Sequence, residues 1–253
     1  MRDFHGKVVV VTGAAGGLGR ALCLRFGAAG ARIVALDRDA SALSGLLADL
    51  QAKGIAATVD RCDVSAASDC RASIAAAIGA FGGVDVLINN AGIFEPTPID
   101  LPEAAWHANW AQVMQVNLYA PAELCKLAIP HFRRHGGGKI INVASRAAHR
   151  GDAPDQWPYA ASKGGLVALT KTIARGFAKD NVLAFVIAPG FTDTEMAYTG
   201  LDDAGVERII ADIPLGSMVR PEECGALAAF LCTDEVRHMT GATFDVNGAS
   251  YVR

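Results

Sequence analysis

Two ionisable side chains four residues apart, Tyr159 and Lys163, could together move a proton. They begin an apolar helical pattern, so this spacing places them on one face of a helix, about one turn apart. A free phenol has a pKa of ~10, which is too high for proton exchange at neutral pH. A neighbouring ammonium, together with a positive nicotinamide ring, would stabilise the phenolate and lower that pKa, making Tyr159 a candidate general acid/base. Tyr and Lys at this spacing also occur as ordinary surface pairs of a helix, so further residues are needed to distinguish a catalytic pair from a surface pair.

Two polar residues are candidates to complete such a site. Ser145 follows the apolar run Lys139–Val143, at the carboxyl end of an expected strand, where ligands bind in parallel sheets. Its hydroxyl could hold a substrate oxygen beside Tyr159, or it could be a turn serine. Asn117 lies in an apolar helical stretch, where a buried amide needs partners. It could hold a water that links Lys163 to solvent, or form a structural hydrogen bond between helices.

A glycine-rich stretch follows the first apolar run, with Gly13, Gly17 and Gly19 at the start of a helical pattern. Glycine allows a tight turn and a close approach of phosphate to the backbone. The start of a helix offers free N–H groups and a positive dipole end to an anion. Ordinary turns between strands and helices also contain glycine, but a position after the first strand favours a dinucleotide-binding loop.

The choice of dinucleotide depends on Asp37, which ends the second apolar run. A carboxylate there can accept hydrogen bonds from both hydroxyls of the adenosine ribose and would repel a 2′-phosphate. The glycine loop also contains no Lys or Arg before Arg20. Both observations favour NAD over NADP. NADP stays open, because Arg38 could hold a 2′-phosphate and Asp37 could instead cap a helix.

These residues need a scaffold, and the apolar pattern predicts one. Val- and Ile-rich runs alternate with Ala- and Leu-rich helical stretches, and several runs are continuously apolar, as in strands covered on both faces. The alternation predicts βαβ crossovers and a Rossmann-type, doubly wound α/β fold with a parallel sheet of seven strands. The expected strands are Val8–Val11, Arg32–Leu36, Ala57–Val59, Val84–Ile88, Lys139–Val143, Leu183–Ile187 and Thr243–Val246, and the expected helices include Leu18–Ala28, Ala40–Lys53 and Ala66–Ala80.

The whole chain, residues 1–253, is expected to be one domain, because no repeat, low-complexity stretch or linker divides it. About half of its residues are apolar, enough to bury a large core. The acidic, small-residue-rich stretch Thr192–Gly216 lies between an expected strand and a later helix. We expect this stretch, called the lid segment below, to be an insertion over the site that can move.

Composition argues against several other classes of protein. The net charge of −3 and the isoelectric point near 6.1 give no basic field for nucleic acid or an anionic membrane. The six cysteines contain no CxxC, and Met1–Lys7 shows no apolar leader. No apolar run approaches the ~20 residues of a membrane span. A soluble cytoplasmic protein is expected, without a metal, because no third ligand accompanies His131 and His135.

Taken in chain order, several motifs resemble the short-chain dehydrogenase/reductase family. Each motif is short, but together they cover nearly the whole chain. The motifs are Thr12-Gly-x3-Gly17-x-Gly19, Asp63-Val64, Asn89-Asn90-Ala91-Gly92, Asn117, Ser145, Tyr159-x3-Lys163 and Pro189-Gly190.

The resemblance implies a role for each of these residues. Asn117, Ser145, Tyr159 and Lys163 would form the catalytic tetrad, with Tyr159 as acid/base, Ser145 as donor to the substrate oxygen and Lys163 as ribose ligand. It also implies an assembly of two or four identical chains, for which the helical stretches Pro121–Phe132 and Gly164–Phe177 could supply an interface or simply pack on the sheet. The implied cofactor-binding residues are Gly13, Gly17, Leu18, Gly19, Asp37, Asp63, Val64, Asn90, Ala91, Gly92, Tyr159, Lys163, Pro189, Gly190 and Thr192.

The second half of the chain is similar to 3-oxoacyl-acyl-carrier-protein reductases of that family, in the stretches 189–196, 213–216 and 245–248. This resemblance implies reversible hydride transfer between nicotinamide and a secondary alcohol or ketone, with a 3-oxoacyl or 3-hydroxyacyl thioester as one candidate substrate. A sugar or polyol dehydrogenase is the alternative within the family. A non-catalytic dinucleotide-binding redox sensor is the alternative outside enzymes, but such proteins commonly lose Tyr159 or Lys163.

Residues between Ser145 and Tyr159 could line the substrate mouth. Arg146 and Arg150 could bind an anionic group of the substrate or be solvated surface charges. His149 and Trp157 fall in the same stretch.

Overall fold

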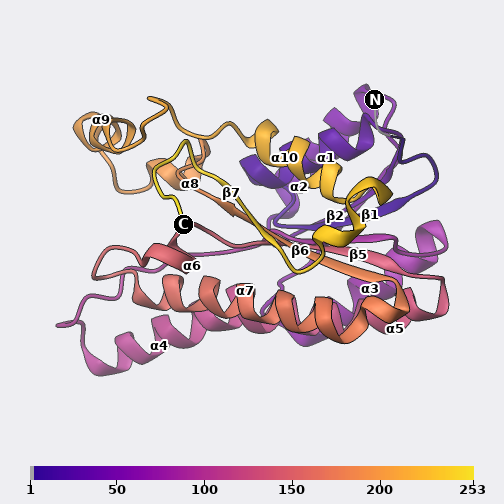
Figure 1. Ribbon diagram of the computed structural model, residues 1–253, viewed down its shortest axis with the longest axis horizontal. Helices are drawn as coiled ribbons and strands as arrows, with labels where there is room; N and C mark the ends of the chain where they lie inside the picture. Colours follow the sequence, from indigo (N-terminus) through magenta and orange to yellow (C-terminus); the bar gives the residue numbers. More distant parts are fainter. Residues whose placement is uncertain (1–2) are drawn as a thin grey trace.

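Seven parallel strands form the centre of the computed structural model, which describes residues 3–253. Their order in the sheet is β3-β2-β1-β4-β5-β6-β7, and helices cover both faces (Figure 1). The seven predicted strands are therefore confirmed as one doubly wound sheet. Met1 and Arg2, the start of the N-terminal segment considered above, lie outside the described residues. The strands are β1 Val8–Thr12, β2 Arg32–Asp37, β3 Ala57–Arg61, β4 Val86–Asn89, β5 Gly138–Val143, β6 Val182–Pro189 and β7 Thr243–Val246.

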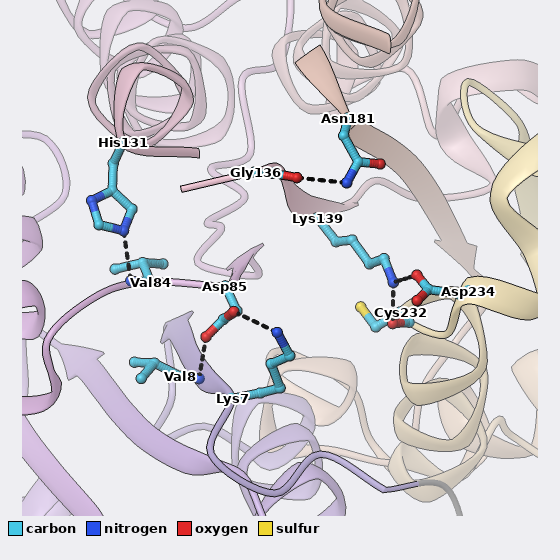
Figure 2. Close-up of polar contacts among 10 residues, drawn as sticks. All are labelled: Lys7, Val8, Val84, Asp85, His131, Gly136, Lys139, Asn181, Cys232 and Asp234. Atoms are coloured by element: carbon cyan, nitrogen blue, oxygen red, sulfur yellow. Dashed lines mark hydrogen bonds and ion pairs between the residues drawn. The ribbon is translucent and has the colours of Figure 1, made fainter. Parts of the chain in front are cut away.

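Polar contacts fix the amino ends of the strands (Figure 2). The carboxylate of Asp85 accepts a hydrogen bond of 2.9 Å from the N–H of Val8. The ring nitrogen Nε2 of His131 accepts one of 3.1 Å from the N–H of Val84. The N–H of Val84 is thus bound by a side chain instead of a neighbouring strand, and β4 begins at Val86 rather than at Val84 as predicted.

The two faces of the sheet are buried against two sets of helices (Figure 1). Val9 and Val11 of β1 belong to one core cluster, while Val8 and Val10 belong to the other. Successive residues of a strand point to opposite faces, so a strand covered on both sides has to be apolar throughout. The first cluster packs against α1 Gly17–Gly27, α2 Ala40–Ala52 and α10 Pro221–Leu231, and the second against α3 Ala67–Phe81, α5 Ala120–Arg134 and α7 Trp157–Phe177.

The helical stretches expected as a possible interface lie within α5 and α7 and pack on the sheet with one face. Phe185 of β6 is fully buried in the first core cluster. No helix among residues 3–253 is both long and apolar enough to cross a membrane. The remaining helical elements are α4 Glu103–Met114, the π-helical turn η1 Gln115–Tyr119, α6 Ala147–Arg150, the 3-10 turns η2 Ala178–Asp180 and η3 Asp234–Met239, and α8 Glu195–Tyr198 and α9 Asp203–Ala211.

The connectivity of the sheet indicates where a ligand should bind. Strands β1 and β4 are neighbours, but the chain proceeds from β1 toward β3 on one side and from β4 toward β7 on the other. The crevice beyond the carboxyl ends of such a pair is the usual ligand site of a doubly wound sheet. Helices α8 and α9 of the lid segment follow the carboxyl end of β6 and project from that end of the molecule (Figure 1).

Candidate active site

The carboxyl ends of β1 and β4 are joined by a compact set of hydrogen bonds. The hydroxyl of Thr12 accepts from the N–H groups of Asn90 and Ala91 at 3.1 and 3.0 Å. The side-chain amide of Asn90 donates to the carbonyls of Thr12 and Gly13, both at 3.0 Å. Asn90 thus braces the glycine loop, and Ala91 lies so close to it that a Cβ on Gly13 would approach the Ala91 main chain to 2.9 Å.

The glycine loop leads into α1 without a cap. No side chain caps the first turn of α1, and that turn contains no acidic residue, so its first N–H groups remain available to an anion. Gly17 is packed against the start of the lid segment, because a Cβ there would lie 2.7 Å from Cγ2 of Thr194. Gly19 faces the carbonyl of Gly13, where a Cβ would collide with backbone. Leu18 is half-buried between them.

Asp37 reaches back from β2 to the same loop. One carboxylate oxygen accepts from the N–H of Ala15 at 3.1 Å, and the other accepts from the N–H of Asp39 at 3.1 Å. Asp63 lies two residues beyond the neighbouring strand β3, where hydrogen bonds from Ser65 lower the pKa of its carboxyl. An uncapped helix start, a crowded glycine turn and a carboxylate at the end of β2 fit the pyrophosphate and ribose of a dinucleotide.

The two asparagines after β4 have different surroundings. Asn89 is buried and donates to Oδ1 of Asn142 on β5 at 2.8 Å. Asn142 in turn donates to Thr170 of α7 at 2.8 Å. Asn89 therefore ties the central strands to α7, whereas Asn90 holds the glycine loop. Val64, predicted beside the adenine, is partly buried against the second core cluster.

Tyr159 and Ser145 meet at the carboxyl end of β5. Tyr159 is the third residue of α7, and Ser145 follows β5 by two residues. The Ser145 hydroxyl accepts from the N–H of Ala147 at 3.1 Å, so it is also a turn serine. Burial raises the pKa of Tyr159 to about 12, and a hydrogen bond from Ser145 opposes that rise.

Lys163 and Asn117 converge on Gly92. A Cβ on Gly92 would lie 3.2 Å from Nζ of Lys163 and 3.4 Å from Oδ1 of Asn117. Lys163 donates to the carbonyl of Val143 at 2.9 Å, and burial lowers its pKa to about 8. Both side chains are buried, with exposed fractions of 3% and 0%. The predicted tetrad is therefore gathered at one edge of the sheet, from β5, α7 and η1.

Two features of these residues could not be read from the sequence. In the protein without its cofactor, burial of the phenol raises the pKa of Tyr159, so the expected lowering by Lys163 and a positive nicotinamide ring stays a prediction for the complex. The Lys163 Nζ lies 5.6 Å from the centre of the tyrosine ring and is bonded to a carbonyl instead. Asn117 was expected within a regular helix, but it lies in the π-helical turn η1.

The hydrogen bonds of Asn117 leave little capacity for a water at its side chain. Its Nδ2 donates to the carbonyl of Ile93 at 2.8 Å and to the hydroxyl of Ser162 at 3.1 Å. Its Oδ1 accepts from the N–H of Ile93 at 2.9 Å. Both amide hydrogens are thus used, and only Oδ1 has a lone pair to spare. The bond to Ser162 of α7 is the structural hydrogen bond between helices that the sequence left open as an alternative. The Oδ1 atom of Asn117 still lies near Gly92, on the same side as Lys163.

The segment after β6 is fixed at its base by main-chain contacts. Pro189 ends β6, and the N–H of Gly190 donates to the carbonyl of Val246 at 2.8 Å. Thr192 pairs with Val219 as an isolated parallel bridge. These contacts pin the base of the lid segment beside the expected nicotinamide position.

The residues between Ser145 and Tyr159 have distinct environments. Arg146 is buried, with its guanidinium 4.8 Å from the ring of Phe191. Arg150 is exposed, and His149 stacks on the ring of Tyr251. The indole N–H of Trp157 donates to a loop carbonyl rather than to the site.

The two helical histidines considered for a metal stack on each other at 4.0 Å. Among residues 3–253, no three potential ligands gather in a metal-binding group.

Three contributions were not foreseen from the sequence. Thr12 joins β1 to Asn90, and a hydroxyl at the carboxyl end of the first strand was a signal for it. Ser162 supports the amide of Asn117. Thr194 packs on Gly17, but nothing in the sequence links two residues so far apart.

Known proteins resemble this chain in sequence along nearly its whole length. The family model described as Enoyl-(Acyl carrier protein) reductase matches residues 13–249. Dehydrogenase/reductase SDR family member 4 of Bos taurus is 34% identical over 247 residues, covering 96% of this chain and 87% of the relative. A 3-oxoacyl-(acyl-carrier-protein) reductase of Thermotoga maritima is 33% identical over 247 residues, covering 96% of this chain and 97% of the relative.

A solved structure shares the whole fold. It is a 7 alpha-hydroxysteroid dehydrogenase complexed with NADH and 7-oxo glycochenodeoxycholic acid, with a TM-score of 0.92 and 28% sequence identity. The match covers 98% of this chain and 95% of that protein.

Proposed function

We infer the reaction from the family: the chain belongs to the short-chain dehydrogenase/reductase family and is an NAD(P)-dependent oxidoreductase that acts on CH–OH groups. We propose that it interconverts a secondary alcohol and a ketone, with Tyr159 as the group that carries the proton. The observation behind this proposal is the meeting of Tyr159, Ser145 and Lys163 at the carboxyl end of β5, beside the braced glycine loop.

When bound, the nicotinamide ring accepts or gives the hydride that changes the oxidation state of the substrate carbon. The protein residues handle the proton and the geometry. Ser145 holds the substrate oxygen next to the hydroxyl of Tyr159. In the reducing direction Tyr159 donates its proton to that oxygen, and its raised pKa keeps the phenol protonated at neutral pH. In the oxidising direction it must first lose that proton, which nearby positive charge favours.

Lys163 has two roles in this proposal. Its Nζ is anchored by the carbonyl of Val143, so its position is fixed although its pKa is lowered. From there it can donate to a ribose hydroxyl and add positive charge near the phenol. Asn117 holds Ile93 beside it and offers Oδ1 to a water.

The cofactor we propose is NAD. Asp37 stands at the end of β2 with its carboxylate turned to the glycine loop, where it would repel a 2′-phosphate. The first basic residue of the loop, Arg20, is paired with Asp49 instead of facing that position. Arg38 is exposed and could hold the 2′-phosphate of NADP, so a comparison of NADH with NADPH tests this choice. Preference for NAD favours oxidation of the alcohol as the working direction.

For the substrate we propose a secondary alcohol with an apolar body, such as a 3-hydroxyacyl thioester, rather than a sugar. The lid segment carries four exposed large apolar side chains, Met196, Tyr198, Leu201 and Leu215. Exposed apolar groups beside a site gain free energy when an apolar ligand covers them, whereas a sugar offers little apolar surface.

The replacement of Tyr159 by Phe tests the reaction, with NADH absorbance as readout and ketones, 3-oxoacyl thioesters, oxosteroids and sugars as substrates. We expect kcat to fall by about a hundredfold or more, because a proton donor is lost. NADH binding, followed by fluorescence, should stay within about twofold, since the phenol adds little to cofactor affinity. Tyr119→Phe is the matched control, because Tyr119 is exposed.

Retained turnover in the Tyr159→Phe protein would refute the role of the phenol. Tight NADH binding by the wild-type protein without turnover of any substrate class would favour the redox-sensor alternative.

A further inference from the structure

Arg146 is a buried arginine, and burying its charged guanidinium costs free energy. It follows Ser145 directly, and its side chain is 7% exposed. Its Nη1 is buried and has no hydrogen-bond partner within the described residues. A buried, charged group without its hydrogen bonds costs free energy, so packing alone does not account for Arg146. Burial and the neighbouring Arg150 lower the pKa of its guanidinium, while Asp212 and Asp152 raise it.

Asp212 faces Arg146 from the lid segment, and its charge is also in an unfavourable position. It is the C-cap residue of α9, in the lid segment, and its side chain is 64% exposed. The carboxyl end of a helix carries a negative partial charge, so an aspartate there is disfavoured locally. The main chain around Asp212 therefore offers no reason for its charge.

The opposite charges of Arg146 and Asp212 face each other, which accounts for the position of both. The Oδ2 of Asp212 lies 4.0 Å from the Nη1 of Arg146 and 3.9 Å from an Nη1 of Arg150. Both distances are longer than the ~2.8 Å of a charge-assisted hydrogen bond. A movement of Asp212 by about 1 Å would satisfy the orphan nitrogen of Arg146 and offset the charge at the end of α9.

The rest of the lid segment is already attached at other points. Thr194 packs on the glycine loop, and Phe191 lies against the guanidinium of Arg146. The N–H of Leu215 donates to the carbonyl of Gly248 at 3.2 Å. At the end of α9, Ile213 is buried and lies against Gly248, while the side chain of Asp212 beside it is exposed and faces the two guanidinium groups.

We propose that Arg146 and Asp212 are positioning residues that latch the lid segment over the substrate end of the site. Arg150 provides a second guanidinium for the same carboxylate. Closure brings Asp212 into hydrogen-bonding distance of Arg146, beside Ser145, and fixes Phe191 over the crevice. The catalytic purpose of this latch rests on the proposed function. The contact between Asp212 and Arg146 itself does not depend on that function.

Hydrogen exchange of the amides of α9 tests the latch in Asp212→Asn, in Arg146→Met and in the double variant. With a latch, exchange in Asp212→Asn should be about fivefold faster than in the wild type, and the double variant should exchange no faster than either single variant. Without a latch, Asp212→Asn should slow exchange, because it removes an unfavourable charge from the helix end. Glu207→Gln, an exposed carboxylate of the same helix, is the control.

Kinetics separate positioning from a purely structural role. The latch predicts that Asp212→Asn raises the KM of the ketone substrate by about fivefold while kcat stays within about twofold. Tighter binding of a carboxylate-bearing substrate by Asp212→Asn would overturn the latch, since it would show that the guanidiniums bind an anion. Unchanged or slower hydrogen exchange of α9 in Asp212→Asn would also overturn the latch. The Asp212→Asn variant decides by itself, because the side chain of Asp212 is exposed and its replacement does not disturb the core. Failure of the wild type to bind NADH would sink the proposed function, while the exchange experiment would still decide the latch.

Discussion

Replacement of Lys163 by Met should make the protein more stable at neutral pH while removing its activity. Lys163 is 3% exposed, and burial lowers its pKa from 10.5 to about 8. At 1.36 kcal/mol per pKa unit, keeping the ammonium in the folded protein costs roughly 3 kcal/mol below pH 8. Met removes this cost but leaves the carbonyl of Val143 without its donor, a loss of about 1–2 kcal/mol. We expect a net gain of about 1–2 kcal/mol at pH 6.5.

The pH dependence is the stronger part of this prediction. Below pH 8 the lysine is charged in both states, and the cost of burying it is fully present. Between pH 8 and 10.5 the folded protein has released the proton and the unfolded chain has not, so wild-type stability rises with pH. By about pH 9.5 the wild type should have recovered about 2 kcal/mol relative to Lys163→Met.

Guanidinium unfolding at about pH 6.5 and about pH 9.5, at fixed protein concentration, measures both stabilities. Lys171→Met is the control, because Lys171 is exposed on the same helix and its replacement should change stability by less than about 0.5 kcal/mol. A stability difference between Lys163→Met and wild type that does not change with pH would refute the reasoning. It would mean that the ammonium is not desolvated by its surroundings.

Three further substitutions test the packing and the loop. Phe185→Ala should lower the free energy of unfolding by about 3–5 kcal/mol in a denaturant titration, because the ring is fully buried. Asn117→Ala should lower it by about 1–3 kcal/mol in the same titration, since the N–H and carbonyl of Ile93 lose their partner. Gly17→Val should weaken NADH binding by about tenfold or more in a fluorescence titration, because its side chain would collide with Thr194.

Each of these has a result that contradicts it. A loss below about 1 kcal/mol for Phe185→Ala would mean that the core collapses around the missing ring. Wild-type stability in Asn117→Ala would show that water replaces the amide at Ile93. Unchanged NADH affinity in Gly17→Val would show that the lid segment moves away from the loop freely.

The pattern along the chain was enough to predict the seven-stranded sheet and its helices. A strand buried on both faces is apolar at almost every residue, and that pattern is visible in β1 and β6 without any structure. A strand boundary differs from the prediction where a side chain replaces a main-chain partner, as at Val84 before β4. The π-helical turn around Asn117 left no mark in the sequence, because its residues are ordinary helix formers.

The sequence by itself determined which residues could do chemistry and the fold that would carry them, because spacing and apolar period are local properties. The tertiary structure alone decided how those groups are tuned. The pKa of Tyr159 depends on the residues that bury it, and these come from distant parts of the chain. The approach of Asp212 to Arg146, and of Thr194 to Gly17, likewise follows from the way the lid segment returns to the sheet. Contacts between residues far apart in the chain are set by packing, which a local pattern does not encode.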